Sequence, residues 1–231
     1  MRMPIYFNDR EVVLPGQLLS DDSRRAGEGT YVMDGKVYAA TVGAATIRNG
    51  KVEVIMFRGP YKPMPGDMVI GVVSDIKPIG VEVDLGGYVT ALLKVKNVKE
   101  LASLDLKVGD VVYARVASSG LKGVLLELNE QFKKINEGVL LKMTPTKIPR
   151  LIGKRGSMIN MLKKITGCNI MVGTNGFVIV NGPSPAKEFA AISAIRLIER
   201  EAHSQGLTDK VMAYVSKLVG GEVSHDASDE A

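Results

Sequence analysis

The stretch 151–159 brings together two glycines and two basic residues at a spacing that suits contact with a phosphodiester backbone. Gly153 and Gly156 flank Lys154 and Arg155. Glycine accepts positive φ and has no Cβ, so a G-x-x-G turn lets the main chain approach a nucleic acid closely. The residues that follow read as a helix, whose positive N-terminal end would face the same phosphates.

The surrounding sequence predicts the elements that must position this turn. Apolar residues at helical spacing predict a helix over 157–166, and Gly167 ends it in the left-handed conformation. Strands are expected at 169–173 and 177–180, joined by a short glycine-containing loop.

Elements before and after this core complete a β-α-α-β-β-α order. A strand at 138–143 and a short helix at 146–151 precede the turn. A longer helix begins at Ser184, the N-cap, and reaches about residue 205. It carries Phe189, Ile192, Ile195 and Ile198 on one face.

A lone G-x-x-G more often only reverses the chain. Here the turn lies in the run Leu151-Ile152-Gly153-Lys154-Arg155-Gly156-Ser157-Met158-Ile159, which is followed by Ile165-Thr166-Gly167-Cys168-Asn169-Ile170. Together these two segments resemble a KH domain of the eukaryotic-type arrangement. The resemblance implies a groove between two small helices and a sheet, with the glycine loop clamping about four nucleotides of single-stranded nucleic acid. The residues it assigns to RNA binding are Ile152, Gly153, Lys154, Arg155, Gly156 and Ser157.

Length and composition favour several small domains in a basic chain. The 231 residues include 30 Lys and Arg against 25 Asp and Glu, giving a net charge of +5 and a pI near 9.2, which points to an anionic partner or simply to a basic protein. One cysteine and two histidines exclude a disulfide framework and argue against structural zinc, and we expect no cofactor. Because no apolar run could span a bilayer and Met1-Arg2-Met3-Pro4 does not begin a signal peptide, we expect a cytoplasmic protein.

Residues 1–62 read as an all-β N-terminal unit. Asp34-Gly35 and Asn49-Gly50 lie between alternating apolar segments and predict two hairpins. Arg24 and Arg25 stand beside acidic residues in a polar loop, where a solvated loop and a docking or RNA-contact role are both open.

Residues 63–134 show a second β pattern of five strands, which fits an OB barrel. The strands are expected at 68–76, 79–85, 88–93, 111–116 and 124–128, with a helix-like insert before 106. Pro63-Met64-Pro65-Gly66-Asp67 before the first strand, and Val83-Asp84-Leu85-Gly86-Gly87 followed by Ala91-Leu92-Leu93, resemble an S1 RNA-binding domain.

The barrel departs from the S1 pattern on its expected binding face. Val81 follows Gly80 where such domains usually carry an aromatic residue, and Tyr88 is the nearby aromatic. Base stacking contributes about 1–3 kcal/mol per base in single-strand binding, so the barrel is expected to act chiefly by charge. The barrel candidates for RNA contact are Lys77, Tyr88, Lys94, Arg115 and Lys122, with Lys96 also considered; a solvated surface is the alternative for each lysine and arginine.

The three parts in this order resemble the KH-bearing RNA-binding cap subunits of the archaeal exosome, the sister family of the zinc-ribbon cap proteins. The segments that distinguish this family from other S1/KH proteins are Leu14-Pro15-Gly16, Gly27-Glu28-Gly29-Thr30-Tyr31 and Tyr61-Lys62-Pro63-Met64-Pro65-Gly66-Asp67. The resemblance implies a non-catalytic cap on a hexameric ring of RNase PH-like phosphorolytic subunits, three cap copies, possible mixing with the zinc-ribbon sister, and single-stranded RNA as ligand. Because residues 1–62 carry no RNA-binding signals, we expect this unit to make the contact with the ring. The KH domain is expected over 138–205, and 206–231 reads as a short helix followed by an acidic, disordered tail.

Two other functions compete with this interpretation. A free-standing regulator of transcription or translation, similar to bacterial elongation factors that join S1 and KH modules, would normally carry a different N-terminal domain and a second KH domain. A nuclease would need clustered carboxylates to hold metal ions, whereas Asp67, Asp84 and Asp110 are scattered through turns. A turn role is the simpler account of Asp67 and Asp110, because each follows a glycine at the start of a strand.

Overall fold

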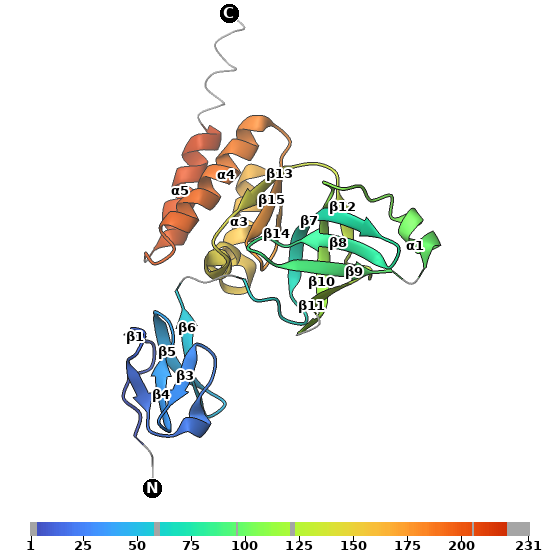
Figure 1. The fold of residues 1–231 in the computed structure, drawn as a ribbon. Coiled ribbons are helices and arrows are strands. Elements are labelled where there is room, and N and C mark those ends of the chain that lie inside the picture. Colours follow the sequence, from blue (N-terminus) through green and yellow to red (C-terminus); the bar gives the residue numbers. More distant parts are fainter. Residues whose placement is uncertain (1–3, 58–60, 96, 121–122, 205, 221–231) are drawn as a thin grey trace, which may run out of the picture. The chain divides into compact units, whose positions relative to one another are not determined.

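The computed structural model describes residues 4–57, 61–95, 97–120, 123–204 and 206–220 (Figure 1). It divides into two compact units, Met1–Gly59 and Pro60–Ala231. The expected tail from residue 221 onward, Lys96 and Lys122 lie outside the described residues.

The first unit consists of two small antiparallel sheets around one core. Its strands are β1 (Glu11–Val13), β2 (Leu18–Ser20), β3 (Thr30–Met33), β4 (Lys36–Ala39), β5 (Gly43–Arg48) and β6 (Lys51–Met56), with a 3-10 turn η1 (Ser23–Arg25). The sheets have the orders β2-β4-β3 and β1-β5-β6. The buried core consists of Val13, Leu19, Ala39, Ala45, Val52 and Val54.

Both hairpins expected in this unit are present. Asp34-Gly35 joins β3 to β4, and Asn49-Gly50 joins β5 to β6. All four residues have positive φ, between 50° and 77°. This conformation matches the twist of a tight hairpin and explains why Asn or Asp precedes glycine.

The first part of the second unit is a closed five-stranded barrel. Its elements are β7 (Met68–Lys77), β8 (Gly80–Asp84), β9 (Thr90–Lys94), α1 (Val98–Ser103), β10 (Val111–Gly120) and β11 (Gly123–Glu127), and β12 (Lys133–Ile135) follows. The strands run β11-β9-β8-β7-β10, and pairing of β10 with β11 closes the barrel. A sixth strand, which sequence patterning did not reveal, extends the sheet: β12 pairs with the first residues of β10.

The second part is a three-stranded sheet covered on one face by helices. Its elements are β13 (Val139–Lys142), η2 (Pro145–Lys147), α2 (Ile148–Ile152), η3 (Lys154–Gly156), α3 (Ser157–Thr166), β14 (Asn169–Val172), β15 (Phe177–Asn181), α4 (Pro185–Arg200) and α5 (Leu207–Gly220). The strand order is β13-β15-β14, and all pairs are antiparallel. The predicted β-α-α-β-β-α order is therefore present, and α5 adds Leu207, Val211 and Val215 to the same core.

Helix α4 differs from its expected form at two points. Ser184 caps it as predicted, accepting a hydrogen bond from the Lys187 N–H, but the helix ends at Arg200 and not near residue 205. Phe189, predicted on the same apolar face as Ile192, Ile195 and Ile198, is 64% exposed. The rest of that face is confirmed, because Ile195 and Ile198 are fully buried and Ile192 packs against the same core. Ala191 and Ala194 are buried beside them, and their small side chains let α4 pack closely against its neighbours.

Candidate nucleic-acid interface

The G-x-x-G turn connects α2 to α3, and its first position requires glycine for two separate reasons. Gly153 has a φ of 75° and ends α2 by donating its N–H to the Pro149 carbonyl. A Cβ at this position would lie 2.7 Å from the Met158 backbone nitrogen, closer than real contacts allow. Gly156 also has positive φ and is the N-cap of α3. The positive φ expected of both glycines is therefore confirmed by backbone geometry.

The basic tip of the turn is open to solvent. Lys154 and Arg155 are both exposed, and Arg155 adopts a left-handed φ of 53°, which is uncommon for a residue with a side chain. No side chain caps the N-terminus of α3, which begins directly after the two cations. The exposed Ser157 opens this helix. The turn thus combines a helix N-terminus with two positive charges, an arrangement suited to phosphate.

An apolar pocket of about 280 Å³ lies beside the turn. Its lining residues are Pro145, Ile148, Pro149, Ile152, Gly153 and Thr174. Ile152, predicted from the sequence to bind RNA, therefore lines an apolar surface next to the basic turn, and such a surface suits an unpaired base or ribose.

The barrel candidates do not form one cluster. Register pairs Lys77 with Gly80 and Gly80 with Lys94, which places both lysines at one end of the β8–β9 hairpin. Tyr88 lies in the turn at the other end, fully exposed, with a left-handed φ of 73°. The lysines are also unequal: Lys77 forms ion pairs with Glu82 and Asp75, which reduce its attraction for phosphate.

Two other barrel positions, Arg115 and Val81, differ in their exposure to solvent. Arg115 is exposed on β10, opposite Met68 in register. Val81, at the position where S1 domains usually carry an aromatic side chain, is fully buried in the barrel core. The barrel therefore exposes one aromatic side chain for stacking at the β8–β9 turn, Tyr88.

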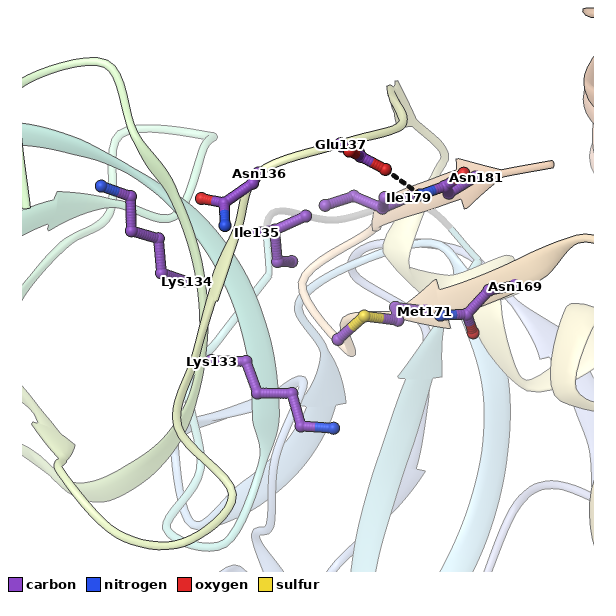
Figure 2. A pocket seen from close by; sticks show the side chains of 9 residues that line it. All are labelled: Lys133, Lys134, Ile135, Asn136, Glu137, Asn169, Met171, Ile179 and Asn181. Carbon is purple, nitrogen blue, oxygen red and sulfur yellow. Dashed lines mark hydrogen bonds between the residues drawn. The ribbon is translucent and has the colours of Figure 1, made fainter. Parts of the chain in front are cut away.

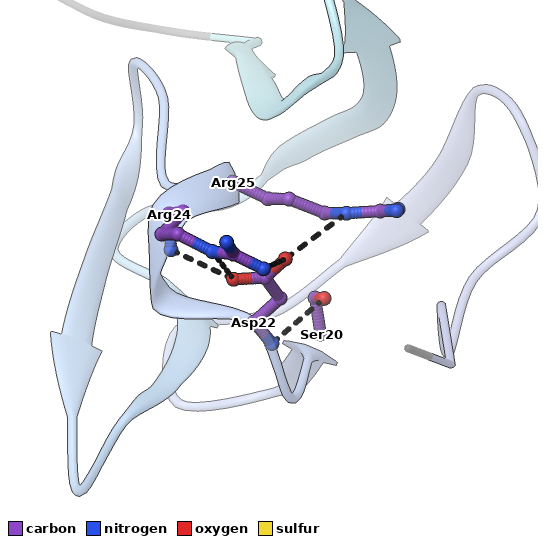
Figure 3. Close-up of polar contacts among 4 residues, drawn as sticks. All are labelled: Ser20, Asp22, Arg24 and Arg25. Carbon is purple, nitrogen blue, oxygen red and sulfur yellow. Dashed lines mark hydrogen bonds and ion pairs between the residues drawn. The ribbon is translucent and has the colours of Figure 1, made fainter. Parts of the chain in front are cut away.

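Arg24 and Arg25 are tied to a buried carboxylate (Figure 3). Arg24 Nε and Nη2 donate to the two Asp22 carboxylate oxygens at 3.0 and 3.2 Å, and Arg25 Nε lies 3.7 Å from Asp22 Oδ2. Hydrogen bonds from Arg24 hold the Asp22 pKa below its usual value. Asp22 also caps the 3-10 turn, so a structural role accounts for this cluster.

The loop between β14 and β15 docks into the barrel, a role that its sequence did not reveal. Asn175 is 95% buried; its Oδ1 accepts from the Ile70 N–H at 3.1 Å, and its Nδ2 donates to the Ile70 and Leu85 carbonyls at 2.6 and 2.8 Å. The Thr174 N–H donates to the Met68 carbonyl at 2.8 Å. In sequence, Thr174-Asn175-Gly176 resembles an ordinary turn. The docking role is visible only in the structure, where the Asn175 amide is buried and fully hydrogen-bonded.

Two of the carboxylates considered for metal-dependent cleavage, Asp67 and Asp110, instead accept hydrogen bonds within the turns in which they lie. Asp67 Oδ2 accepts from the Tyr61 hydroxyl at 2.6 Å and the Met64 N–H at 3.0 Å. Asp110 Oδ2 accepts from the Lys107 N–H at 2.7 Å and pairs with Lys134 at 2.8 Å. Within the described ranges, no three His, Cys, Asp or Glu side chains gather as they would around a metal ion. Nor is any described helix long and apolar enough to cross a membrane.

Three family models match consecutive parts of the chain. They are the exosome RNA binding protein RRP4 N-terminal domain over residues 10–57, the S1 RNA binding domain over 62–118 and the KH domain over 138–186. These matches agree with the barrel and with the G-x-x-G fold described above.

Relatives named as exosome components match most of the chain. The chain is 38% identical to the exosome complex component Rrp4 of Methanobrevibacter smithii, over 96% of this chain and 76% of that protein. It is 40% identical to the Rrp4 of Thermococcus kodakarensis, over 91% and 87% respectively. A crystal structure titled as a putative exosome complex RNA-binding protein aligns with a TM-score of 0.63 at 29% identity, covering 71% of this chain and 99% of that one. The chain belongs to the Rrp4 family of exosome complex components, the S1-plus-KH type.

Proposed function

We propose that this protein is a non-catalytic RNA-binding subunit of the exosome cap. It captures single-stranded RNA and guides it into a phosphorolytic 3′-to-5′ exoribonuclease ring for degradation and processing. The observation that carries the proposal is the G-x-x-G turn, with two exposed cations beside the uncapped N-terminus of α3. Membership in the Rrp4 family connects that turn to the exosome.

The residues proposed to contact RNA fall into two groups. The KH group is Ile152, Gly153, Lys154, Arg155, Gly156 and Ser157, and the barrel group is Lys77, Tyr88, Lys94, Arg115 and Lys122. The first group lies on one continuous turn, whereas the described members of the second are spread over the barrel. The KH turn is therefore the main phosphate contact, and the barrel adds weaker contacts along the strand.

The ring does the cutting, and this chain does the capturing. Asp67 and Asp110 support this division because each carboxylate is already engaged by backbone N–H groups of its own turn. Three cap copies around one pore, alone or mixed with the zinc-ribbon sister, would raise the local RNA concentration without any single tight site. The complex would act in the cytoplasm.

Residues 1–62 are proposed to dock on the RNase PH-like hexameric ring. An apolar row on the outer face of sheet β1-β5-β6 supports this role, because Val12, Ala44 and Ile55 are opposite one another in register. Val12 is 59% exposed and Ile55 46% exposed. Large exposed aliphatic side chains in a row are typical of a protein interface.

Charge reversal at the turn tests RNA capture. In Lys154→Asp/Arg155→Asp both glycines remain, so the turn is kept while anions replace the cations. Affinity for single-stranded RNA should fall, and the slope of log K against log salt should become shallower by up to about 1.4, for two lost phosphate contacts at about 0.7 each. Arg200→Asp/Lys217→Asp makes the same change of net charge on α4 and α5 and should leave the slope nearly unchanged. An equal effect of both variants would show that only overall charge matters.

Mixing experiments test assembly. The chain and its phosphorolytic ring should form a stable complex by light scattering and degrade single-stranded RNA more processively than the bare ring, while the isolated chain leaves RNA intact. Deleting residues 1–62 should abolish ring association but preserve RNA binding. Ring association by the deleted chain would refute the docking role, and failure of the intact chain to associate while it binds RNA would favour a free-standing regulator.

A further inference from the structure

The tip of the β5–β6 hairpin in the first unit carries two cations directly opposite each other. Register pairs Arg48 with Lys51, and Asn49 and Gly50 form the turn between them. Arg48 and Lys51 are both exposed, and neither forms an ion pair with any residue that the structure describes. We propose that this cation pair contacts a patch of carboxylates on the ring subunit that receives the β1-β5-β6 face. The inference rests on the proposed docking role and adds the chemistry of the partner surface to it.

The other described cations of the first unit are already engaged. Each pairs with an aspartate of the same unit: Arg10 with Asp9, Lys36 with Asp21, and both Arg24 and Arg25 with Asp22 (Figure 3). An engaged cation attracts a partner less strongly, because its own carboxylate balances its charge. Among the described residues of this unit, Arg48 and Lys51 therefore keep their full charge for a partner.

Two opposite cations do nothing for the stability of the hairpin itself. The turn is already supplied by Asn49 and Gly50, which have positive φ of 51° and 77°. Like charges directly opposite each other on antiparallel strands are destabilising, whereas opposite charges at such positions stabilise the pair. Natural sequences keep local conflicts of this kind at functional sites. The pair at Arg48 and Lys51 therefore indicates contact with an anion.

The cation pair lies on the same face of the sheet as the apolar row of the proposed docking surface. Val52 and Val54 are buried in the core of the first unit. Since side chains alternate along a strand, Lys51 and Ile55 both point to the opposite, outer face. They are four residues apart, which is about 13 Å along an extended strand. The partner surface should therefore carry an apolar area and, about 13 Å from it, the acidic patch.

Glu53, on the same outer face, favours a protein surface over RNA as the partner. It lies between the cation pair and the apolar row, opposite Thr46, and it forms no ion pair with any described residue. A protein can place a hydrogen-bond donor against this carboxylate beside the acidic patch, whereas the phosphates along an RNA strand would repel it. Two cations, one carboxylate and an apolar row on one face therefore fit a protein partner better than a nucleic acid.

Lys51→Glu tests the proposal, because hairpin stability and ring association should respond in opposite ways. The substitution places a carboxylate opposite Arg48, and opposite charges across a strand pair are stabilising. Thermal unfolding of the full chain should therefore show no loss of stability. Association with the ring, followed by stopped flow at about 50 mM salt, should be about tenfold slower, because charges at the rim of an interface act mainly on the association rate. At about 500 mM salt the difference should shrink to less than about twofold, since salt screens exposed charges.

Two matched variants separate charge at the tip from other effects. Lys217→Glu makes the same change of net charge at an exposed position of α5 and should leave the association rate within about twofold of the wild type. Val12→Ala/Ile55→Ala removes the apolar part of the face. It should instead speed dissociation at both salt concentrations, because salt does not screen apolar contact and most interface substitutions act on dissociation.

The outcomes distinguish this contact from the docking role itself. A wild-type association rate for Lys51→Glu at low salt would refute the cation contact and leave docking intact, whereas failure of the wild-type chain to associate would overturn both. If Lys51→Glu weakened RNA binding by the free chain more than Lys217→Glu and left ring association unchanged, the tip would be an RNA contact and the proposal would be wrong. Should Lys51→Glu lower the unfolding temperature, Arg48→Gln/Lys51→Gln decides the matter. It removes both charges without adding a carboxylate, and its association should show the same salt-dependent slowing.

Discussion

Replacing Asn175 with alanine should loosen the connection between the barrel and the KH sheet. The change removes the partner of three buried backbone groups: the N–H and carbonyl of Ile70 and the carbonyl of Leu85. Each buried group left unpaired costs about 1–3 kcal/mol. With some compensation by water, we expect a loss of roughly 3–5 kcal/mol, which is large for a single substitution.

Hydrogen exchange at the Ile70 amide measures this loss directly, because that N–H donates to Asn175 Oδ1. If the junction opens separately from the cores, exchange should accelerate by about a hundredfold or more, whereas buried amides of the KH core should change little. Asn160→Ala, which removes an exposed amide on α3, is the matched control and should leave Ile70 unaffected. Ile70 exchange within about threefold of the wild type would refute the reasoning.

Two further substitutions test single structural assignments. Gly153→Ala should destabilise the KH domain by about 1–3 kcal/mol and abolish RNA binding, because the added methyl group would meet the Met158 backbone nitrogen. Urea unfolding measures the stability and fluorescence anisotropy measures RNA binding. An unchanged urea midpoint would contradict the assignment. Asp110→Asn tests the pH dependence of stability. Hydrogen bonding from Lys134 holds the Asp110 pKa below its usual 3.8. The ionised carboxylate therefore stabilises the fold above that pH, and this contribution is lost as the pH falls through the lowered pKa. Relative to the wild type, the Asn variant should therefore lose stability at pH 7 and lose less on acidification, and parallel stability curves from pH 2 to 7 would refute this.

Local patterns predicted those features that depend on short-range backbone chemistry. Helix α3 has the expected bounds, Ser157–Thr166, because its apolar spacing and the flanking Gly156 and Gly167 define it locally. The hairpins at Asp34-Gly35 and Asn49-Gly50 follow from residues that tolerate positive φ. The G-x-x-G turn was predictable for the same reason, since its geometry is specified within a few residues.

Patterning was less reliable where packing decides the outcome. Phe189 fits the same apolar helical repeat as Ile195 and Ile198, yet they are fully buried and it is exposed. Strand β12 was missed since its three residues, two of them lysines, carry no apolar alternation. It forms because the free edge of β10 offers backbone partners.

The sequence by itself therefore determined the order of modules, the family and the position of the basic G-x-x-G turn. Tertiary structure decided which polar residues are free and which are committed. Lys77 and Lys134 look alike in sequence to Lys94 and Lys133, yet the first two are engaged by carboxylates. Asn175 reads as a turn residue but is a buried connector, and one pocket combines residues from β12, β14 and β15 (Figure 2). Such features arise from contacts between distant segments, which no local spacing of residues specifies.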